Sequence, residues 1–198
     1  NAGGVTTLVS ACLTNQHENV SFLLDRGAAI ESFDSNGFTA LTYCCRFNST
    51  ESARVLIERG ANIKVRDRIG STLLMNTIEK GHIKVAQLLL EKGANINDTD
   101  PGGWTALAMA VNEGTEETVR FLLSNGANPN TALFDDLCSP LRSTACDGKL
   151  NIARLLLDHG AILDIPDGKG MTPIRVATNN GHREMVEFFL SRGSDIHQ

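Results

Sequence analysis

Apolar residues recur along the chain at intervals of three and four positions, in six short sets separated by polar stretches. Such spacing places the apolar side chains on one face of a helix. The six sets are Val20, Leu23 and Leu24; Ala53, Leu56 and Ile57; Ala86, Leu89 and Leu90; Val119, Leu122 and Leu123; Ala153, Leu156 and Leu157; and Val186, Phe189 and Leu190. The pattern therefore predicts six amphipathic helices that each bury one face.

Each of these helices is followed by a glycine, which suits the left-handed backbone at a helix end. The six glycines are Gly27, Gly60, Gly93, Gly126, Gly160 and Gly193, and the intervals between them are 33, 33, 33, 34 and 33 residues. A fixed period of this size is the mark of a stacked-repeat protein. Six repeats are predicted, at approximately residues 1–33, 34–66, 67–99, 100–133, 134–166 and 167–198.

A second, shorter helix is predicted ahead of each amphipathic one, because a residue able to cap free amide groups recurs with the same period. These caps are Thr6, Thr39, Thr72, Thr105, Ser139 and Thr172. Pro140 and Pro173 follow two of them, where a missing amide hydrogen costs little. Between the two helices stands a residue suited to a left-handed turn, namely Asn15, Asn48, Gly81, Gly114, Gly148 or Gly181. Each repeat is thus predicted to be a helix-turn-helix unit followed by a projecting, β-hairpin-like turn.

Around the capping residues the chain resembles the ankyrin-repeat family, whose signature is Thr-Pro-Leu-His-x-Ala. The matching segments are Thr39-Ala-Leu-Thr42, Thr105-Ala-Leu-Ala108, Ser139-Pro-Leu-Arg142 and Thr172-Pro-Ile-Arg175. The resemblance covers essentially all 198 residues and implies an all-α ankyrin-repeat solenoid, a single domain over residues 1–198 that belongs to a longer chain. The signature His is absent from all six repeats. Because family members use it to tie neighbouring turns together, its loss predicts looser repeats.

Composition and charge argue against several classes of function. A formal net charge of -5 argues against nucleic-acid binding, which relies on basic surface. No apolar run reaches the length of a membrane span, so membrane insertion is not expected. The five cysteines contain no Cys-x-x-Cys pair, which indicates neither a disulfide framework nor a zinc site. An intracellular protein, cytoplasmic or nuclear, is predicted, with Cys12 and Cys45 as small core residues.

The ankyrin resemblance implies a non-enzymatic module that binds a protein or peptide segment on a concave face made by the turns and first helices. Binding side chains are then expected just before each capping residue and at the end of each first helix. The predicted partner-binding residues are Phe33, Phe38, Tyr43, Arg46, Phe47, Arg66, Arg68, Trp104, Met109, Asn112 and Glu113. The alternative is a regulatory or ligand-sensing ankyrin domain of a larger enzyme, channel or effector.

The aromatic residues among these are followed by a basic turn that contains Lys64, Arg66 and Arg68. A basic and aromatic patch fits an acidic peptide with apolar anchors, since aromatic groups and Arg supply most hot-spot energy. Alternatively, these charges balance Glu31 and Asp34 in the preceding turn, an arrangement that stabilises little when exposed.

Two further features of the expected face each have two interpretations. Trp104, the only tryptophan, is predicted either to stack on a partner or to wedge against a neighbouring turn. The interval between Gly126 and Gly160 is one residue longer than the others, and there Phe134-Asp-Asp-Leu137 stands where the other repeats have a turn with glycine. It is either a bend that accommodates a partner or a tolerated surface insertion. A small-molecule ligand is not expected.

Catalytic signatures are missing from the sequence. The five histidines lack ligand spacing, and the phosphate-loop, dinucleotide and nucleophile-elbow patterns are absent. No catalytic residue, metal site or cofactor is therefore predicted. A resemblance to ankyrin targets of asparaginyl hydroxylase implies hydroxylation of Asn97, against the simpler interpretation that Asn suits a turn.

The end repeats carry many apolar residues. Those in question are Leu8, Val9, Leu13, Met185, Val186, Phe188, Phe189 and Leu190. Terminal repeats need a polar outer face for solubility. Further repeats or packing segments are therefore predicted beyond one or both ends of the chain.

Overall fold

The computed structural model describes residues 6–113, 115–131 and 138–195. These residues form twelve α-helices and no strand, which confirms the all-α prediction. The chain divides into two compact halves, an N-terminal half of residues 1–100 and a C-terminal half of residues 101–198. That all 198 residues act as a single domain stays a prediction.

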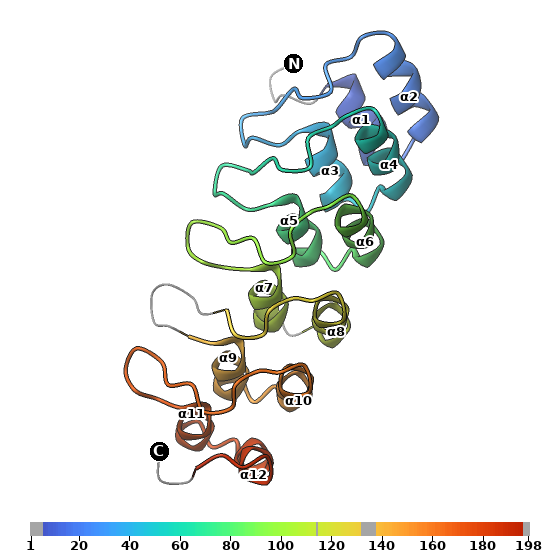
Figure 1. The fold of residues 1–198 in the computed structure, drawn as a ribbon. Coiled ribbons are helices and arrows are strands. Elements are labelled where there is room, and N and C mark those ends of the chain that lie inside the picture. Colours follow the sequence, from blue (N-terminus) through green and yellow to red (C-terminus); the bar gives the residue numbers. More distant parts are fainter. Residues whose placement is uncertain (1–5, 114, 132–137, 196–198) are drawn as a thin grey trace. The chain divides into compact units, whose positions relative to one another are not determined.

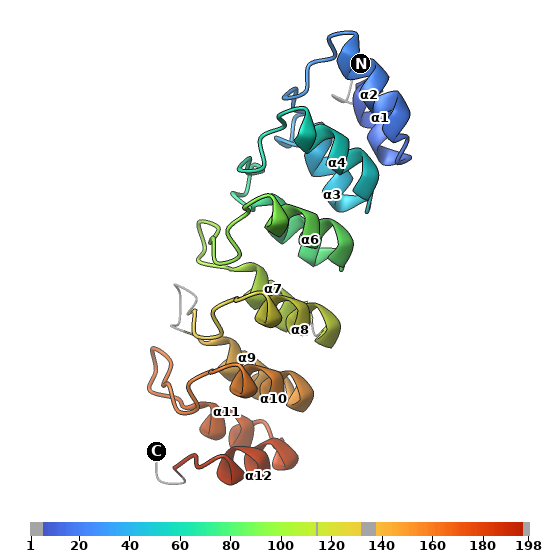
Figure 2. The same ribbon diagram turned by 45° about the vertical axis from the view of Figure 1, so that its right-hand side comes forward.

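The N-terminal half contains three helix pairs that stack one on the next (Figures 1 and 2). The helices are α1 (Thr7–Leu13), α2 (His17–Asp25), α3 (Ala40–Arg46), α4 (Thr50–Glu58), α5 (Leu73–Glu79) and α6 (Ile83–Glu91). The first helices α1, α3 and α5 form one row, and the second helices α2, α4 and α6 form another. The turns that join successive pairs project to one side, where they can present side chains to a partner (Figure 1).

The C-terminal half repeats the same arrangement with three further pairs. Its helices are α7 (Ala106–Glu113), α8 (Glu116–Ser124), α9 (Pro140–Asp147), α10 (Leu150–Asp158), α11 (Pro173–Asn179) and α12 (Arg183–Ser191). The first helices α7, α9 and α11 pack in series, and each contacts the second helix of its own pair. Both halves are therefore built from the predicted helix-turn-helix unit.

The predicted apolar stripes form the core of each half. The middle residue of the stripe is completely buried in five of the six second helices, namely Leu56, Leu89, Leu122, Leu156 and Phe189. The corresponding Leu23 of α2 is half-buried. Neighbouring helix pairs thus bury the apolar face that a single pair would leave exposed.

The cysteines of the first two repeats pack in this core. Cys12, Cys44 and Cys45 have no exposed surface, in agreement with the prediction that Cys12 and Cys45 are core residues. Burial raises the pKa of the Cys45 thiol to about 12. The Cys45 thiol is therefore neutral at physiological pH and behaves as a small apolar group.

The apolar residues of the end repeats lie mostly inside. Leu8, Val9, Met185, Phe188 and Phe189 are buried, Leu13 and Val186 are half-buried, and Leu190 is 39% exposed. These side chains therefore do not form the apolar outer faces expected from the sequence. That further repeats exist beyond the ends stays a prediction, and the apolar residues of the end repeats no longer support it.

Five of the six predicted caps form. In each, the hydroxyl oxygen of the capping residue accepts a hydrogen bond from the amide three residues later, at 3.1–3.3 Å. These caps are Thr6, Thr39, Thr72, Thr105 and Ser139. The prediction is wrong for the side chain of Thr172, because its buried hydroxyl has no hydrogen-bond partner among the residues described.

The turn residues adopt the predicted left-handed backbone. Asn15 and Asn48 have φ of 53° and 59°, and the six glycines that close the second helices have φ between 84° and 94°. Gly114 lies outside the described residues. Gly148 has a second constraint, because a Cβ atom there would lie 2.8 Å from the ring of His182. That ring reaches the carbonyl oxygen of Cys146 at 3.0 Å.

We expect Gly148→Ala to destabilise the chain more than Gly181→Ala. Both residues have φ near +73°, so each substitution incurs the left-handed penalty of roughly 1–2 kcal/mol. Only Gly148→Ala displaces the His182 ring and its hydrogen bond, which adds about 1 kcal/mol, because no atom lies within 4 Å of a Cβ at Gly181. Urea unfolding of both variants measures the difference, and equal losses would contradict this account.

Candidate partner-binding site

A buried carboxylate, Asp34, organises the turn ahead of α3. It is only 8% exposed. One oxygen, Oδ1, accepts hydrogen bonds from the backbone amides of Asn36 at 2.8 Å and Phe38 at 2.9 Å. The other, Oδ2, accepts a bond from the Tyr43 hydroxyl at 2.8 Å. This carboxylate therefore fixes both the turn and the direction of the Tyr43 ring.

The hydrogen bonds shift the pKa values of both groups. Burial opposes ionisation of Asp34, but the bonds from Phe38, Tyr43 and Asn36 outweigh it and lower the pKa of this carboxyl below its usual value. Burial and the neighbouring Asp34 carboxylate raise the pKa of the Tyr43 hydroxyl. Asp34 is therefore ionised, and Tyr43 is protonated, across the physiological pH range.

Three aromatic rings follow one another along this turn and α3. Phe38 and Tyr43 meet edge to face, with centroids 5.8 Å apart, and Tyr43 stacks on Phe47 at 6.4 Å. The Arg46 guanidinium lies over the Phe38 ring, 5.1 Å from its centroid. We call Phe38, Tyr43, Arg46 and Phe47 the aromatic surface. Phe47 forms its outer end and is 56% exposed.

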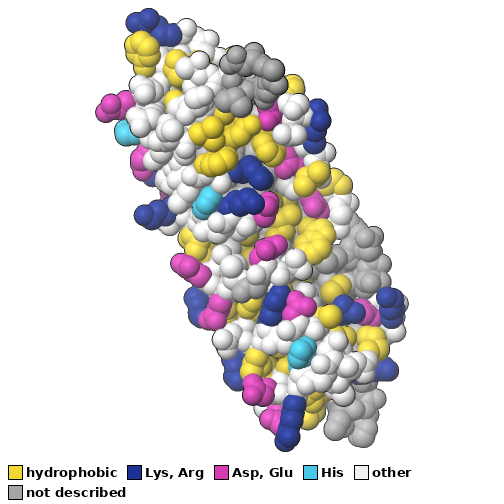
Figure 3. Space-filling model, turned by 180° about the vertical axis from the view of Figure 1, so that it is seen from behind, with side chains coloured by type: hydrophobic (Ala, Val, Ile, Leu, Met, Phe, Trp, Pro, Cys, Tyr) yellow, Lys and Arg dark blue, Asp and Glu magenta, His cyan; other side chains and the backbone are white. Residues whose placement is uncertain are grey.

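The aromatic surface lies in a half of the molecule that presents hydrophobic side chains to solvent. Seen from behind, hydrophobic groups gather in the upper part of the view and are bordered by Lys or Arg and by Asp or Glu side chains (Figure 3). Phe33 is not in ring contact with the three stacked residues. It is 74% exposed and lines a separate open cavity of about 560 Å³ with Val65 and Arg66.

Arg46 is held by the next repeat. Its Nη1 donates to Asn76 Oδ1 at 2.8 Å and lies 3.7 Å from a Glu79 carboxylate oxygen. Asn76, which is buried, in turn donates through Nδ2 to Asp67 Oδ2 at 3.1 Å. The sequence prediction missed Asn76 and Glu79. The 33-residue period gave one signal for Asn76, because it occupies the same repeat position as Tyr43. Asn76 bonds Asp67 as Tyr43 bonds Asp34.

Among the described residues, no ion pair joins Lys64, Arg66 or Arg68 to Glu31 or Asp34, the pairing considered as an alternative from the sequence. Arg66 donates through Nη1 to the carbonyl oxygens of Gly70 at 2.7 Å and Thr99 at 2.8 Å. Its Nη2 lies 3.5 Å from Asp98 Oδ2. Arg66 therefore connects two turns within the chain.

Arg68 differs from its basic neighbours Arg46 and Arg66. Its backbone amide donates to the carbonyl oxygen of Asn36 at 3.2 Å, which joins two turns. Its exposed side chain has no hydrogen bond or ion pair with any residue that the structure describes. Ile69, beside it, is 73% exposed. The guanidinium of Arg68 is thus available to a partner.

The remaining predicted residues belong to the C-terminal half. Trp104 and Met109 are half-buried, whereas Asn112 and Glu113 are exposed. The carbonyl oxygen of Asn112 accepts a bond from Lys149 Nζ at 2.7 Å. A surface that combines these residues with the aromatic surface stays a prediction. The irregular turn at residues 134–137 lies outside the described residues.

Asn97, the predicted hydroxylation site, lies exposed in the turn after α6, where its amide donates to Asn95 Oδ1 at 3.1 Å. Its hydroxylation stays a prediction. Among the described residues, no three His, Cys, Asp or Glu side chains come together as a metal site requires. No helix in the described ranges has the length and apolar character needed to cross a bilayer.

Comparisons with known proteins agree with this architecture. A family model for ankyrin repeats in three copies matches residues 1–67, 62–132 and 134–198. The ankyrin repeat domain of Bcl-3, described as a unique member of the IkappaB protein family, is 29% identical, with a TM-score of 0.87 over 96% of this chain and 84% of that one. An ankyrin repeat domain from Acinetobacter baumannii AYE is also 29% identical, with a TM-score of 0.84 over 95% of this chain and 98% of that one.

Curated relatives match over shorter segments. The potassium channel AKT1 of Oryza sativa subsp. indica is 42% identical over 57 residues, which is 29% of this chain and 6% of the channel. A putative ankyrin repeat protein of Rickettsia bellii is 44% identical over 48 residues, 24% of this chain and 14% of that protein. The ARF GTPase-activating protein Git of Drosophila melanogaster is 37% identical over 68 residues, 34% and 9% of the two chains. The matched segments are thus small parts of these relatives.

We expect Tyr43→Phe to destabilise the chain by about 1 kcal/mol at neutral pH, because it removes the hydroxyl bond to Asp34 while keeping the ring. The folded-state pKa of Asp34 is lowered. The bond to the carboxylate therefore contributes fully above the unfolded pKa, about 3.9, and is lost as the pH falls through the lower folded value. Urea unfolding of both proteins at pH 7 and pH 3 measures this, and an equal difference at both would contradict it.

Proposed function

This chain belongs to the ankyrin-repeat family, and from that premise we propose that it is a non-enzymatic module that binds a peptide segment of a partner protein at the aromatic surface. Proteins with this fold are generally protein–protein interaction modules. To this general role the proposal adds which face of the chain binds and which chemical groups the partner presents. An intracellular location belongs to the same proposal and is supported by the five free cysteines.

The fixed geometry of the rings is the observation on which the proposal rests. Tyr43 is held by Asp34, and Arg46 is held by Asn76 and Glu79. Side chains that are already ordered lose less conformational entropy when a partner binds. Aromatic residues and Arg are also the commonest hot spots in interfaces. Phe47, exposed at the end of this ordered set, is therefore the expected anchor.

Charge in the same half supports a partner segment with an acidic residue. The charges of Arg46 and Arg66 are shared with Glu79 and Asp98. Arg68 has no such partner in the described part of the chain. We therefore expect an acidic side chain of the peptide to pair with Arg68, while an apolar side chain packs on Phe47.

A second candidate function is supported by the relatives. The chain matches 6% of a potassium channel and 9% of a GTPase-activating protein, whose names imply further activities. In this alternative, the repeats are a regulatory or ligand-sensing part of a larger enzyme, channel or effector. The sequence of the full-length protein would distinguish the two, because a catalytic or membrane domain is recognisable there.

We expect Phe47→Ala to weaken peptide binding by at least about tenfold, the loss typical of a hot spot. The probe is a set of peptides selected on the 198-residue chain from a displayed random library, with affinity measured by calorimetry. Phe22→Ala is the matched control, because Phe22 is 54% exposed on α2 and Phe47 is 56% exposed. Equal affinity for the wild type and Phe47→Ala, or equal losses in both variants, would overturn the proposed face.

We expect Arg68→Glu to select against acidic peptides. Peptides obtained on the wild-type chain should contain Asp or Glu beside an apolar residue and should lose affinity for this variant by about fivefold or more, since the ion pair becomes a repulsion. The loss should diminish as salt is raised. Selected peptides without acidic residues, or with unchanged affinity for Arg68→Glu, would remove the acidic part of the proposal.

A further inference from the structure

One repeat position links each projecting turn to the next by a hydrogen bond. It is the fourth residue after the glycine that closes a second helix, and in three junctions it supplies an acceptor oxygen. Glu31 Oε1 accepts from the amide of Asn62 at 2.7 Å, and Asn130 Oδ1 accepts from the amide of Ile162 at 2.8 Å. Asp164 Oδ1 accepts from the Ser194 hydroxyl at 2.5 Å. In the first two junctions the donor is the amide of the second residue after the next closing glycine, and in the third it is a serine hydroxyl one residue earlier.

Lys64 occupies this position in the turn between α4 and α5. An ammonium group has no lone pair and cannot accept a hydrogen bond. The amide of Asn95, 33 residues after Asn62, has no acceptor among the residues described, and the Lys64 side chain has no hydrogen bond or ion pair there. At this junction the donor of the repeat remains, but its acceptor has been replaced by a cation.

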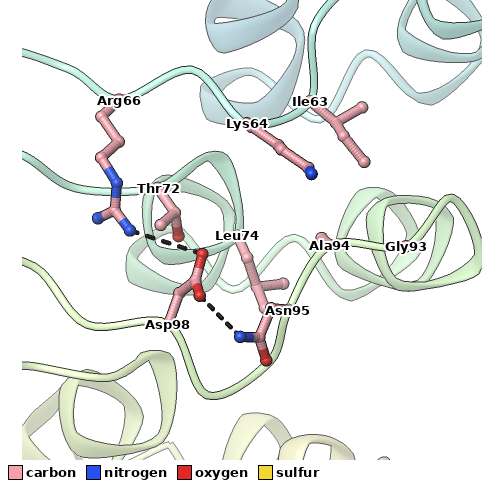
Figure 4. Close-up of a pocket in the computed structure, with 9 residues that line it drawn as sticks. All are labelled: Ile63, Lys64, Arg66, Thr72, Leu74, Gly93, Ala94, Asn95 and Asp98. Carbon is pink, nitrogen blue, oxygen red and sulfur yellow. Dashed lines mark hydrogen bonds and ion pairs between the residues drawn. The ribbon is translucent and has the colours of Figure 1, made fainter.

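A cavity of about 430 Å³ lies at this junction, inside the N-terminal half. Figure 4 shows the Lys64 ammonium pointing into the space between the two turns, opposite Asn95. Ile63, Leu74 and Ala94 give the cavity an apolar lining. The volume lies within the range of small-ligand sites.

The charge at the rim of this cavity is positive. Its one carboxylate, Asp98, accepts a bond from Asn95 Nδ2 at 2.7 Å through Oδ1 and faces Arg66 at 3.5 Å through Oδ2 (Figure 4). Of the lining residues, Lys64 and Arg66 carry two positive charges against the one negative charge of Asp98. The positive charge of Lys64 is therefore not neutralised.

We propose that this cavity binds a carboxylate carried on a short aliphatic group. The carboxylate takes the place that Glu31 and Asn130 fill in the sister junctions. One of its oxygens accepts from the Asn95 amide, and its charge pairs with Lys64. The aliphatic part packs on the apolar lining. No residue of the aromatic surface lines this cavity, so the site does not depend on the proposed function.

The direct test is an NMR titration of the ¹⁵N-labelled 198-residue chain with 4-methylpentanoate, using its neutral isostere 4-methylpentanamide and inorganic phosphate as comparisons. We expect only the carboxylate to shift the Asn95 amide signal with saturation, at concentrations on the order of millimolar for so small a ligand. An equal response to the amide, a stronger response to phosphate, or no shift at Asn95 would each overturn the proposal.

Substitution of Lys64 gives a second, independent readout. Lys64→Glu restores the acceptor of the sister junctions, so it should abolish carboxylate binding and slow hydrogen exchange of the Asn95 amide by about tenfold. Lys64→Met should abolish binding without slowing exchange, because it supplies no acceptor. Lys84→Glu makes the same charge change at an exposed residue of α6 and should leave binding intact. Retained binding in Lys64→Glu, or unchanged exchange at Asn95, would overturn the proposal.

Two peptides distinguish the sources of the carboxylate. Acetyl-Ala-Leu-Glu-Ala-amide offers a glutamate side chain, and acetyl-Ala-Leu-Leu offers a free C-terminus. Once 4-methylpentanoate has shifted the Asn95 amide, a Lys64-dependent shift with either peptide assigns that source, and a shift with 4-methylpentanoate alone assigns a free acid. No shift with 4-methylpentanoate overturns the proposal, whatever the peptides do.

Discussion

The structure depends on contacts between repeats, because its helices are too short to be stable alone. Each helix has between seven and nine residues, fewer than the roughly 12–15 that an isolated helix needs to be even marginally stable. A single helix pair also leaves its apolar stripe open to water. Stacking removes both difficulties, since Leu56 and Leu89 of adjacent second helices become completely buried. Side chains at the junction between two repeats can therefore affect both the stability of the fold and the binding of a partner.

The junctions within each half use different side chains to satisfy the same backbone groups. The last carbonyl groups of a helix have no partner within that helix. The His82 ring reaches the carbonyl oxygen of Cys45 at 2.9 Å, and Lys149 Nζ donates to the carbonyl oxygens of Val111 at 3.0 Å and Asn112 at 2.7 Å. A histidine and a lysine at the same repeat position thus both contact the last carbonyl groups of the first helix in the preceding repeat. The predicted looseness from the missing signature His stays a prediction, and these contacts are ones that the signature does not describe.

The fold was predictable because period and cap residues act locally. Regular spacing of glycines and apolar stripes placed the second helices of the described residues, and the recurring capping residues placed the first helices. Asn15 and Asn48 were recognised by their tolerance of a left-handed turn. The site was less predictable, because its geometry depends on contacts about thirty residues apart. The sequence grouped four aromatic residues, of which the rings of Phe38, Tyr43 and Phe47 meet, whereas Phe33 lines a separate cavity. It could not show that Arg46 is held by Asn76, since that bond joins two repeats.

Comparison among sister repeats separates the residues that build the fold from those available for function. A side chain that makes the same bond as its counterpart in another repeat is explained by folding, as Glu31 and Asn130 are when each ties its turn to the next. Lys64 cannot make that bond, so folding does not explain its presence. Phe47 and Arg68 stand out for a related reason. Both are exposed, the Phe47 ring stacks on Tyr43 of its own repeat, and the Arg68 side chain has no hydrogen bond or ion pair with a described residue. In a repeat protein, the side chain that departs from its sisters without supporting the stack is the one on which a functional hypothesis can rest.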